Sequence, residues 1–230
     1  MKSIVLLSGG LDSTTMVRIA QDKGYEVYAL TFNYGQKHSI EIESAKTICK
    51  KYGIKNHCIA NIDIKAIGGS ALTDDKLQVN KGRQVLQYDP TKENIPLSYV
   101  PARNTIFLSY ALGYAEVIGA SKILIGVNAI DYSGYPDCRP EYLQKFNELA
   151  KIATAAAVKG ELAIEIEAPL LNMNKAEIIA EGTRLGVDYS ATLSCYDPDR
   201  NGSACGKCDA CLLRLNGFKA NGMKDSAQYQ

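Results

Sequence analysis

Short apolar runs alternate with amphipathic stretches along most of the chain. The apolar, β-branched runs predict five strands, at residues 3–7, 25–32, 56–62, 122–127 and 162–168. Helical spacing of apolar residues predicts helices at 13–23, 38–52, 104–118, 140–159 and 175–185. Strands that alternate with helices of this length are typical of βαβ units, so the sequence predicts an α/β fold with a parallel five-stranded sheet.

Local signals support two of these helices. Asn174 and Glu177 have the spacing of a capping box, and Gly186 follows as the C-cap of the helix that they open. The helix at 104–118 takes its periodicity from apolar residues at Phe107, Tyr110, Ala111, Tyr114, Val117 and Ile118.

Residues 64–98 lack this regularity. They contain Gly68-Gly69, Pro90, Pro96 and scattered charges, and such a stretch is usually a functional loop, a lid or disordered. We interpret it as a flap near the site, although a surface insertion without function fits equally well. We expect a main domain at 1–188 and a small C-terminal region at 189–230.

The composition excludes some classes of protein. The 230 residues are 46% hydrophobic, and 26 basic residues balance 25 acidic ones, which argues against a large nucleic-acid partner. No apolar run approaches the ~20 residues that a membrane-spanning helix needs. The first apolar run is too short and too early for a signal peptide, so we expect a cytoplasmic protein with no membrane partner.

A glycine-rich loop, Ser8-Gly9-Gly10-Leu11-Asp12-Ser13, separates the first strand from the first helix. Its glycines let the backbone curl around an anion, and the helix N-terminus behind it attracts phosphate. The Asp12 carboxylate would repel phosphate unless it holds Mg²⁺. We expect the loop residues and Thr14 to bind phosphate; a glycine turn that only caps the helix is the alternative. The loop matches neither the Walker pattern nor the dinucleotide fingerprint.

Four of the seven cysteines lie close together near the C-terminus. Cys205, Cys208 and Cys211 have C-x2-C-x2-C spacing, and Cys195, separated from them by nine residues, supplies a fourth thiolate, as in a structural zinc site. An iron–sulfur cluster and redox-active thiols are the alternatives. Cys49, Cys58 and Cys138 are scattered elsewhere, and this uneven, odd set is unlike a secreted disulfide framework.

The segment after the fourth strand is rich in polar and aromatic residues. Asp131, Tyr135, Asp137 and Arg139 could bind a flat heterocycle, with carboxylates that accept paired N–H donors and a ring that stacks on its face. A capped surface loop explains the same residues equally well.

Two cations stand at predicted helix starts, where the helix dipole disfavours positive charge. Arg103 could bind a phosphate or a substrate carboxylate, or form a surface ion pair. Lys175 could reach phosphates bound at the glycine-rich loop, or be a solvated lysine.

The loop at 8–13 resembles the SGGxDS signature of the PP-loop ATP pyrophosphatases, which include GMP synthetases and tRNA thiolases. Four further stretches extend the likeness: Val-Pro-Ala-Arg-Asn at 100–104, Gly-Val-Asn at 126–128, Ser-Gly-Tyr-Pro-Asp-Cys-Arg at 133–139 and the four cysteines. Over nearly its whole length, the chain resembles the 7-cyano-7-deazaguanine synthase family of the queuosine pathway.

The resemblance implies a fold, a reaction and roles for residues. The fold would be that of adenine-nucleotide hydrolases, with helices on both faces of the sheet and a zinc-binding appendage. The enzyme would be a ligase that uses ATP, Mg²⁺ and ammonia to convert 7-carboxy-7-deazaguanine to 7-cyano-7-deazaguanine. It would form a homodimer. Catalysis would depend on Asp12, Arg103 and Lys175, and base binding on Asp131, Tyr135, Asp137 and Arg139.

Two other functions compete with this interpretation. A tRNA-modifying PP-loop enzyme would need an RNA-binding surface and a catalytic cysteine outside the zinc set. A non-catalytic module that binds nucleotide and zinc would leave the polar segment at 126–139 unexplained.

Overall fold

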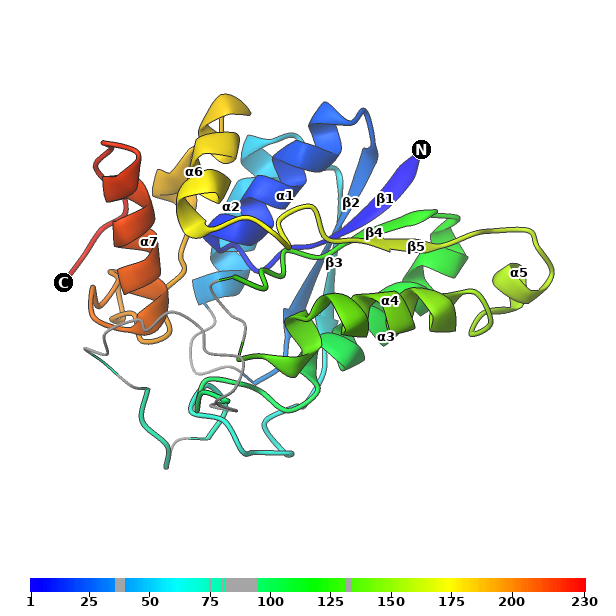
Figure 1. The fold of residues 1–230 in the computed structure, drawn as a ribbon, viewed down its shortest axis with the longest axis horizontal. Helices are drawn as coiled ribbons and strands as arrows, with labels where there is room; N and C mark the ends of the chain where they lie inside the picture. Colours follow the sequence, from blue (N-terminus) through cyan, green and yellow to red (C-terminus); the bar gives the residue numbers. More distant parts are fainter. Residues whose placement is uncertain (36–39, 75, 80, 82–94, 131–133) are drawn as a thin grey trace.

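The computed structural model describes residues 1–35, 40–74, 76–79, 81, 95–130 and 134–230. The elements of this part of the chain are, in order, β1 (Lys2–Leu6), α1 (Leu11–Asp22), β2 (Glu26–Asn33), α2 (Ile40–Lys51), β3 (Asn56–Asn61), α3 (Arg103–Ile118), β4 (Lys122–Leu124), η1 (Pro136–Cys138), α4 (Pro140–Ala150), α5 (Ala155–Val158), β5 (Glu165–Glu167), α6 (Lys175–Arg184), η2 (Tyr189–Ala191) and α7 (Asp209–Ala220) (Figure 1).

The five strands form one sheet in the order β3-β2-β1-β4-β5, and every neighbouring pair is parallel. The fold class predicted from the sequence is therefore confirmed. The chain runs outward from β1 to β3 and then crosses back to β4 on the other side of β1. In open parallel sheets, ligands bind beyond the carboxyl ends of the strands at such a switch point.

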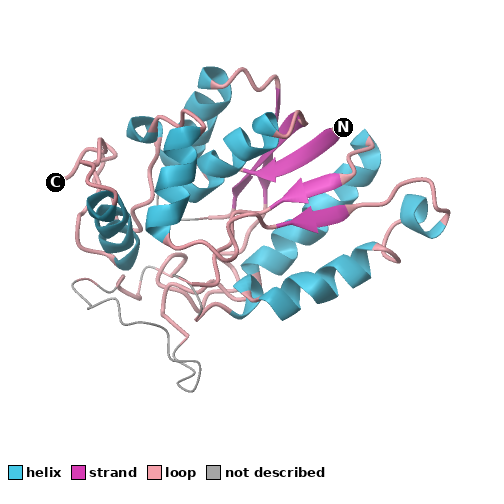
Figure 2. Cartoon of the chain, turned by 45° about the horizontal axis from the view of Figure 1, so that its top comes forward, coloured by secondary structure: helices cyan, strands magenta, loops and turns pink. Residues whose placement is uncertain are grey.

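Alternate residues of the strands build two cores. Ile4 and Leu6 of β1 pack in the core with α3 and α4, whereas Val5 and Leu7 pack in the core with α1, α2 and α6. Helices consequently cover both faces of the sheet, as Figure 2 shows. A strand that is buried on both faces reads as a continuous apolar run, which is why β1 was recognisable in the sequence.

Three predicted elements differ from the structure. The fourth and fifth strands are shorter than predicted, and the helix expected at 140–159 is two helices, α4 and α5. Thr154 causes the break, because its side chain accepts a hydrogen bond from the Ala157 N–H (3.2 Å) and so caps α5. The Glu116 carboxylate also accepts from the Ala156 N–H (2.8 Å), which ties α5 to α3.

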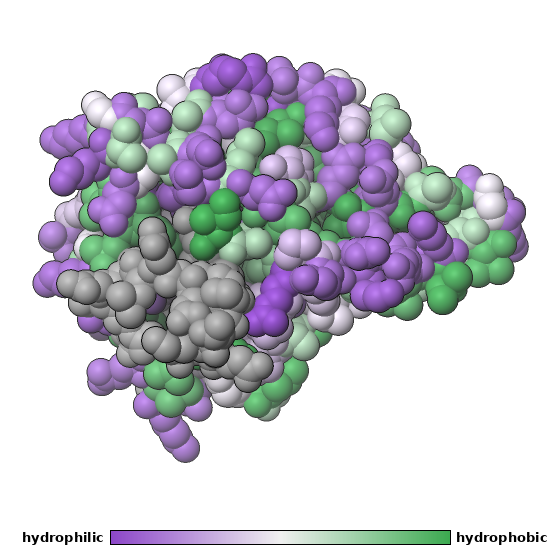
Figure 3. Space-filling view, viewed as in Figure 1, coloured by the Kyte–Doolittle hydropathy of each residue, from purple (hydrophilic) through white to green (hydrophobic). Residues whose placement is uncertain are grey.

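Part of the apolar pattern of α3 faces solvent. Val117 is 82% exposed and Tyr110 is 44% exposed, whereas Leu108, Ala111 and other residues of α3 are buried against the sheet. Further apolar side chains gather at the end of the molecule that carries α5, where Ile152 and Val158 are exposed (Figure 3). The exposed apolar residues on α3 and around α5 therefore do not belong to the core that packs on the sheet.

The C-terminal region packs against the main sheet domain through α7, which lies beside α6 (Figure 1). Phe218 of α7 is buried in the same core as α1 and α6. Arg214 and Asp225 form an almost fully buried ion pair (2.7 Å) behind the cysteine cluster. Among the described residues, no helix is long and apolar enough to cross a membrane.

Candidate active site and metal centre

An open cavity of about 230 Å³ lies at the carboxyl ends of β1 and β2 and beside the segment that follows β4. The glycine-rich loop forms one wall, with Ser8, Gly10, Asp12 and Ser13 among the lining residues. Residues from α3, from the start of α2 and from 193–196 line the rest. The cavity therefore occupies the switch point of the sheet, where this fold places its ligands.

Gly9 allows the loop to pack against α2. Its φ of 81° lies in the left-handed region, which favours glycine. A Cβ at this position would stand 2.8 Å from the Ala45 nitrogen, the Glu41 carbonyl oxygen and the Ser44 Cβ. Because backbone atoms of α2 occupy that space, any side chain would push the helix away from the loop.

The loop presents donors at the N-terminus of α1. Within the described part of the chain, the N–H groups of Asp12 and Ser13 have no hydrogen-bond partner, and the helix dipole adds positive potential there. The Ser8 and Ser13 hydroxyls lie 3.1 Å apart in the same loop. Thr14, however, is fully buried and donates to the Gly10 carbonyl (2.8 Å), so its hydroxyl does not reach the cavity. This arrangement can bind an anion.

Lys175 and Asp12 form a close ion pair. The Lys175 ammonium donates to both carboxylate oxygens of Asp12, at 2.7 and 2.8 Å. Lys175 is buried and Asp12 is partly exposed toward the cavity. The two predicted catalytic residues thus lie together at the loop, with charges that a phosphate and its Mg²⁺ could share.

The capping box of α6 positions Lys175. Asn174 accepts from the Glu177 N–H (3.0 Å), and the Glu177 carboxylate accepts from the Asn174 N–H (2.8 Å), as predicted. Lys175 is the first residue of the helix that this box begins. The cap therefore fixes the point at which the lysine leaves the backbone.

Arg103, Tyr34 and Glu41 also line the cavity. Burial opposes the charge of Arg103, but Tyr34, Tyr135 and Asp137 around the guanidinium raise its pKa overall. Burial raises the pKa of Glu41 to about 7, and Arg103 offsets only part of this effect. Glu41 is therefore a carboxyl group that can take up or release a proton near neutral pH.

The backbone before Arg103 is strained. Ala102, the N-cap of α3, has φ 52° and ψ 20°, and it is the one non-glycine residue with positive φ among those described. Such conformations cluster at functional sites, where the surrounding structure holds them in place.

Tyr135 lines the cavity, whereas Asp137 does not. Tyr135 is buried, lines the cavity and hydrogen-bonds the Ser98 hydroxyl (2.7 Å). Asp137 is buried outside the cavity lining, where its carboxylate accepts from the Asn104 N–H (3.1 Å) at the start of α3. Burial raises the pKa of Asp137, although Asn104 and Arg103 partly offset the effect.

Of the other two predicted substrate-binding residues, Arg139 and Asp131, the structure describes only Arg139. Arg139 is exposed and precedes α4 as its N-cap residue. Asp131 lies outside the described residues, as do residues 75, 80 and 82–94 of the predicted flap at 64–98. Leu72, a described residue of that segment, lines the cavity.

Several lining residues had not been predicted as site residues, Glu41 and Ser194 among them. Residues 191–194 pack directly on the loop: the Leu193 N–H donates to the Gly9 carbonyl (3.0 Å) and the Leu11 N–H donates to the Ser194 hydroxyl (3.1 Å). The Ser44 hydroxyl bridges the carbonyls of Gly9 and Ala191, at 3.0 and 2.9 Å. In the sequence, Ser194 stood out only because it precedes Cys195, and that position suggested a role near the metal site rather than in phosphate binding.

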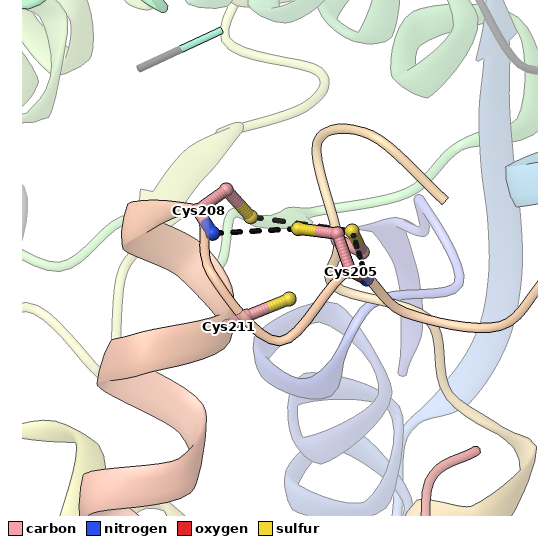
Figure 4. Close-up of side chains that lie close together, drawn as sticks. Cys205, Cys208 and Cys211 are labelled. Carbon is pink, nitrogen blue, oxygen red and sulfur yellow. Dashed lines mark hydrogen bonds between the residues drawn. The ribbon is translucent and has the colours of Figure 1, made fainter. Parts of the chain in front are cut away.

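The four predicted metal ligands converge. The sulfur atoms of Cys195, Cys205, Cys208 and Cys211 all lie within 4.8 Å of one another, and all four residues are buried. Figure 4 shows the side chains of Cys205, Cys208 and Cys211 pointing toward one another, with Cys211 on α7. Four thiolates around one zinc ion stand ~3.8 Å apart, given a Zn–S distance of ~2.3 Å.

Backbone N–H groups surround these sulfurs. The Cys195 sulfur accepts from the N–H groups of Asp197 (3.3 Å) and Cys205 (3.2 Å). The Cys205 sulfur accepts from Lys207 (3.4 Å) and Cys208 (3.3 Å). Donors of this kind stabilise thiolates, so the cluster has the ligands, spacing and surroundings of a site for one metal ion.

Comparison with known proteins identifies the family. Residues 2–222 match the family described as queuosine biosynthesis protein QueC. The chain belongs to this family. It is 56% identical over 228 residues to the 7-cyano-7-deazaguanine synthase of Desulfatibacillum aliphaticivorans, with 99% of this chain and 96% of the relative covered. The corresponding enzyme of Rickettsia rickettsii is 52% identical, with 99% and 98% covered.

Solved structures support the fold alone. A predicted subunit of a tRNA methyltransferase from Methanocaldococcus jannaschii superposes with a TM-score of 0.51 at 16% identity, covering 97% of this chain and 89% of the other. The U34-tRNA thiolase NcsA of Methanococcus maripaludis, solved with its [4Fe-4S] cluster, gives a TM-score of 0.50 at 16% identity and covers 96% and 66%.

Proposed function

We propose that this member of the QueC family is an ATP-dependent ligase that converts 7-carboxy-7-deazaguanine and ammonia to 7-cyano-7-deazaguanine in queuosine biosynthesis. The proposal rests on near-full-length similarity to curated enzymes of that name. The cavity supports it, because a phosphate loop, an Asp–Lys pair, a partly buried arginine and a tyrosine line or border one open space.

The chemistry proceeds through two activated intermediates. ATP adenylates the substrate carboxylate with release of pyrophosphate, and ammonia then displaces AMP to give the amide. A second ATP adenylates the amide oxygen with release of pyrophosphate, and loss of AMP and of both N–H protons leaves the nitrile. Neither step needs a nucleophilic side chain, so the enzyme has to position the reactants, stabilise charge and exclude water.

ATP binds at the glycine-rich loop in this proposal. The unpartnered N–H groups of Asp12 and Ser13 donate to phosphate oxygens, and Lys175 neutralises charge at the same place. Mg²⁺, when bound with ATP, would be held by the Asp12 carboxylate and would neutralise phosphate charge. Thr14, which was expected among the nucleotide ligands, acts by closing the first turn of α1 instead.

The base and its carboxylate occupy the remaining cavity. Arg103 pairs with the substrate carboxylate or with the α-phosphate, and Tyr135 borders the heterocycle. Glu41 is suited to accept a proton, because ammonium has to lose one before it attacks. Asp131, Asp137 and Arg139 remain proposed contributors to base binding, Asp137 through its effect on Arg103 and the start of α3.

The metal of the cysteine cluster is zinc in this proposal. Four thiolates within 4.8 Å of one another suit a single tetrahedral ion. The thiolates of an iron–sulfur cluster bind several different irons and therefore have to stand farther apart than ligands of one ion. With four protein ligands, zinc has no open position and its role is structural.

A tRNA thiolase is the alternative, and two of the three cysteines outside the cluster are unsuited to its chemistry. Burial, with Asp137 nearby, raises the pKa of the Cys138 thiol to about 12, and burial raises that of Cys49 to about 11. Thiols with such pKa values are protonated near neutral pH and are poor nucleophiles. The near-neutral net charge of the chain also gives no general attraction for RNA.

We further propose a cytoplasmic homodimer. All seven cysteines are free of disulfide bonds, and six of them are buried, which suits a reducing compartment. The exposed residues Tyr110 and Val117 lie on one face of α3, and an apolar face of this kind is typical of an interface between subunits.

The experiment that tests the function is one incubation of purified, zinc-loaded protein with ATP, Mg²⁺, ammonium and 7-carboxy-7-deazaguanine, read by mass spectrometry. We expect the nitrile together with AMP and pyrophosphate. A folded protein that forms no nitrile would contradict the proposal, and ADP with phosphate would contradict the adenylation chemistry.

A further inference from the structure

Ser194 lies where the C-terminal region meets the phosphate loop. It lines the cavity, directly before Cys195 in the chain. Its hydroxyl oxygen accepts a hydrogen bond from the Leu11 N–H (3.1 Å), at the first position of α1. It also accepts a longer one from the Arg214 guanidinium (3.4 Å).

The hydroxyl has one donor and two acceptor sites. Leu11 and Arg214 occupy both acceptor sites, and neither of these N–H groups can accept a hydrogen bond in return. The hydroxyl hydrogen has no acceptor among the described residues. By contrast, the Ser13 and Thr14 hydroxyls both donate to the Gly10 carbonyl, at 3.1 and 2.8 Å. The two hydrogen bonds that Ser194 accepts therefore orient its hydroxyl group, and the hydroxyl hydrogen is available to a ligand in the cavity.

Arg214 is itself fixed. Its side chain is 3% exposed and forms a two-bonded ion pair with Asp225, at 2.7 and 2.9 Å. It also donates to the Thr192 hydroxyl (2.7 Å) and to the Tyr189 carbonyl (2.9 Å). A hydroxyl that accepts from a guanidinium is polarised and becomes a stronger donor. Its position cannot drift, because the arginine is held from several sides.

We propose that the Ser194 hydroxyl donates a hydrogen bond to a phosphate oxygen of bound ATP, and that Arg214 is its positioning residue. The inference rests on the proposed use of ATP by this site. Ser194 takes up one N–H at the N-terminus of α1 and offers an O–H beside the free N–H groups of Asp12 and Ser13. It thereby extends the anion site from the loop to the C-terminal region.

The test compares Ser194→Ala with Ser194→Thr and with a matched control, Ser190→Ala. Ser190 lies in the same segment, but its exposed hydroxyl donates to Asp188 (2.6 Å) and does not line the cavity. We expect Ser194→Ala to lower kcat/KM for ATP about 10- to 100-fold, the loss of one directed hydrogen bond to a charged oxygen. Ser194→Thr, which keeps the hydroxyl, should recover most of the loss, and Ser190→Ala should match the wild type.

A second comparison separates positioning from stability. Metal content and thermal midpoint are measured for every variant, and Ser194→Ala should retain both. Arg214→Lys should lower kcat/KM for ATP in the wild-type background and have little further effect in Ser194→Ala. If Ser194→Ala does not fold, Ser194→Cys replaces it, because a thiol keeps the size but is a weak donor.

The outcomes distinguish this inference from the proposed function. If the wild type forms nitrile and Ser194→Ala equals Ser190→Ala in its kcat/KM for ATP, the inference is wrong and the function stands. Equal and additive losses from Arg214→Lys and Ser194→Ala would overturn the positioning role. A wild type that neither binds ATP nor forms nitrile would remove the proposed function, and the inference with it.

Discussion

At the scale of single residues, Glu41 is the carboxyl group whose surroundings most disfavour its charge. Burial raises its pKa to about 7, while Arg103 compensates only in part. Because the folded-state pKa is raised, the native protein holds a proton that the unfolded chain has already lost between pH ~4.5 and ~7. Stability contributed by the protonated carboxyl is therefore lost as the pH rises through this window.

Replacing Glu41 by Gln should remove this dependence. We expect the free energy of unfolding at pH 8 to rise by about 1–3 kcal/mol, with solvent at the half-buried side chain reducing the gain, and its slope between pH 5 and 7 to flatten. Urea denaturation at several pH values measures both, and Glu43→Gln, at an exposed neighbour, is the control. An unchanged pH slope in Glu41→Gln would contradict the assignment. Activity should fall although stability rises, as expected when a functional site retains a costly charge.

The sequence predicted those site residues that belong to a local pattern. Asp12 lies in a glycine-rich loop and Lys175 in a capping box, and each of these motifs specifies a local backbone geometry. Glu41 and Ser194 have no such pattern, since they reach the cavity only after α2 and the C-terminal region have packed on the loop. Packing likewise decides the place of Asp137: its carboxylate lies at the start of α3 and outside the cavity lining, and its part in base binding stays a prediction.

At the scale of elements, α6 links stability to function, because its first residue is Lys175 and its N-terminus is a capping box. A weaker cap would let the first turn fray and would loosen the contact between Lys175 and Asp12. The helix end thus acts as the support for a predicted catalytic side chain.

We expect Asn174→Ala to lower the free energy of unfolding by about 1 kcal/mol and to reduce kcat/KM for ATP. Thr154→Ala is the matched control, because Thr154 caps α5 in the same way but lies far from the residues that line the cavity. Chemical denaturation and steady-state kinetics are measured on both. Equal kinetic effects in the two variants, or none in Asn174→Ala, would contradict a role for the cap in presenting Lys175.

Most elements were predictable because burial imposes periodicity on them, and their errors also have physical causes. The chain at 140–159 keeps helix-forming residues throughout, but Thr154 and the distant Glu116 interrupt it through hydrogen bonds that no periodicity records. In α3, apolar spacing suggested a single buried face, yet Val117 is 82% exposed. Apolar periodicity predicts burial without saying whether the partner is the sheet or another surface.

At the scale of the whole molecule, the cysteine cluster and the nucleotide site belong to one mechanical unit. Leu193 and Ser194 hydrogen-bond the phosphate loop, and the next residue, Cys195, belongs to the four-cysteine cluster that could hold a metal ion. Arg214 and Asp225 fix the same segment from behind. Any change that releases Cys195 should therefore be felt at the loop.

Removal of the metal by a chelator should lower the thermal midpoint and weaken ATP binding together. The loss in stability should be several kcal/mol, since a structural metal contributes its binding free energy to folding. Differential scanning calorimetry and isothermal titration with ATP measure the two effects, and readdition of Zn²⁺ should reverse both. A lower midpoint with unchanged ATP affinity would show that the cluster stabilises its own region without supporting the loop.

In the proposed homodimer, the exposed apolar face of α3 forms the interface between the two subunits. A stable interface buries ~800 Å² of each partner, and the apolar centre of such a surface cannot accommodate an unpaired charge. We therefore expect the wild type to have the mass of a dimer by light scattering coupled to gel filtration, and Val117→Asp to have that of a monomer. Ile67→Asp, at a residue 60% exposed outside this face, is the control and should remain dimeric. A monomeric wild type would exclude the dimer, whereas a Val117→Asp protein that stays dimeric would place the interface on another surface, such as the apolar end around α5.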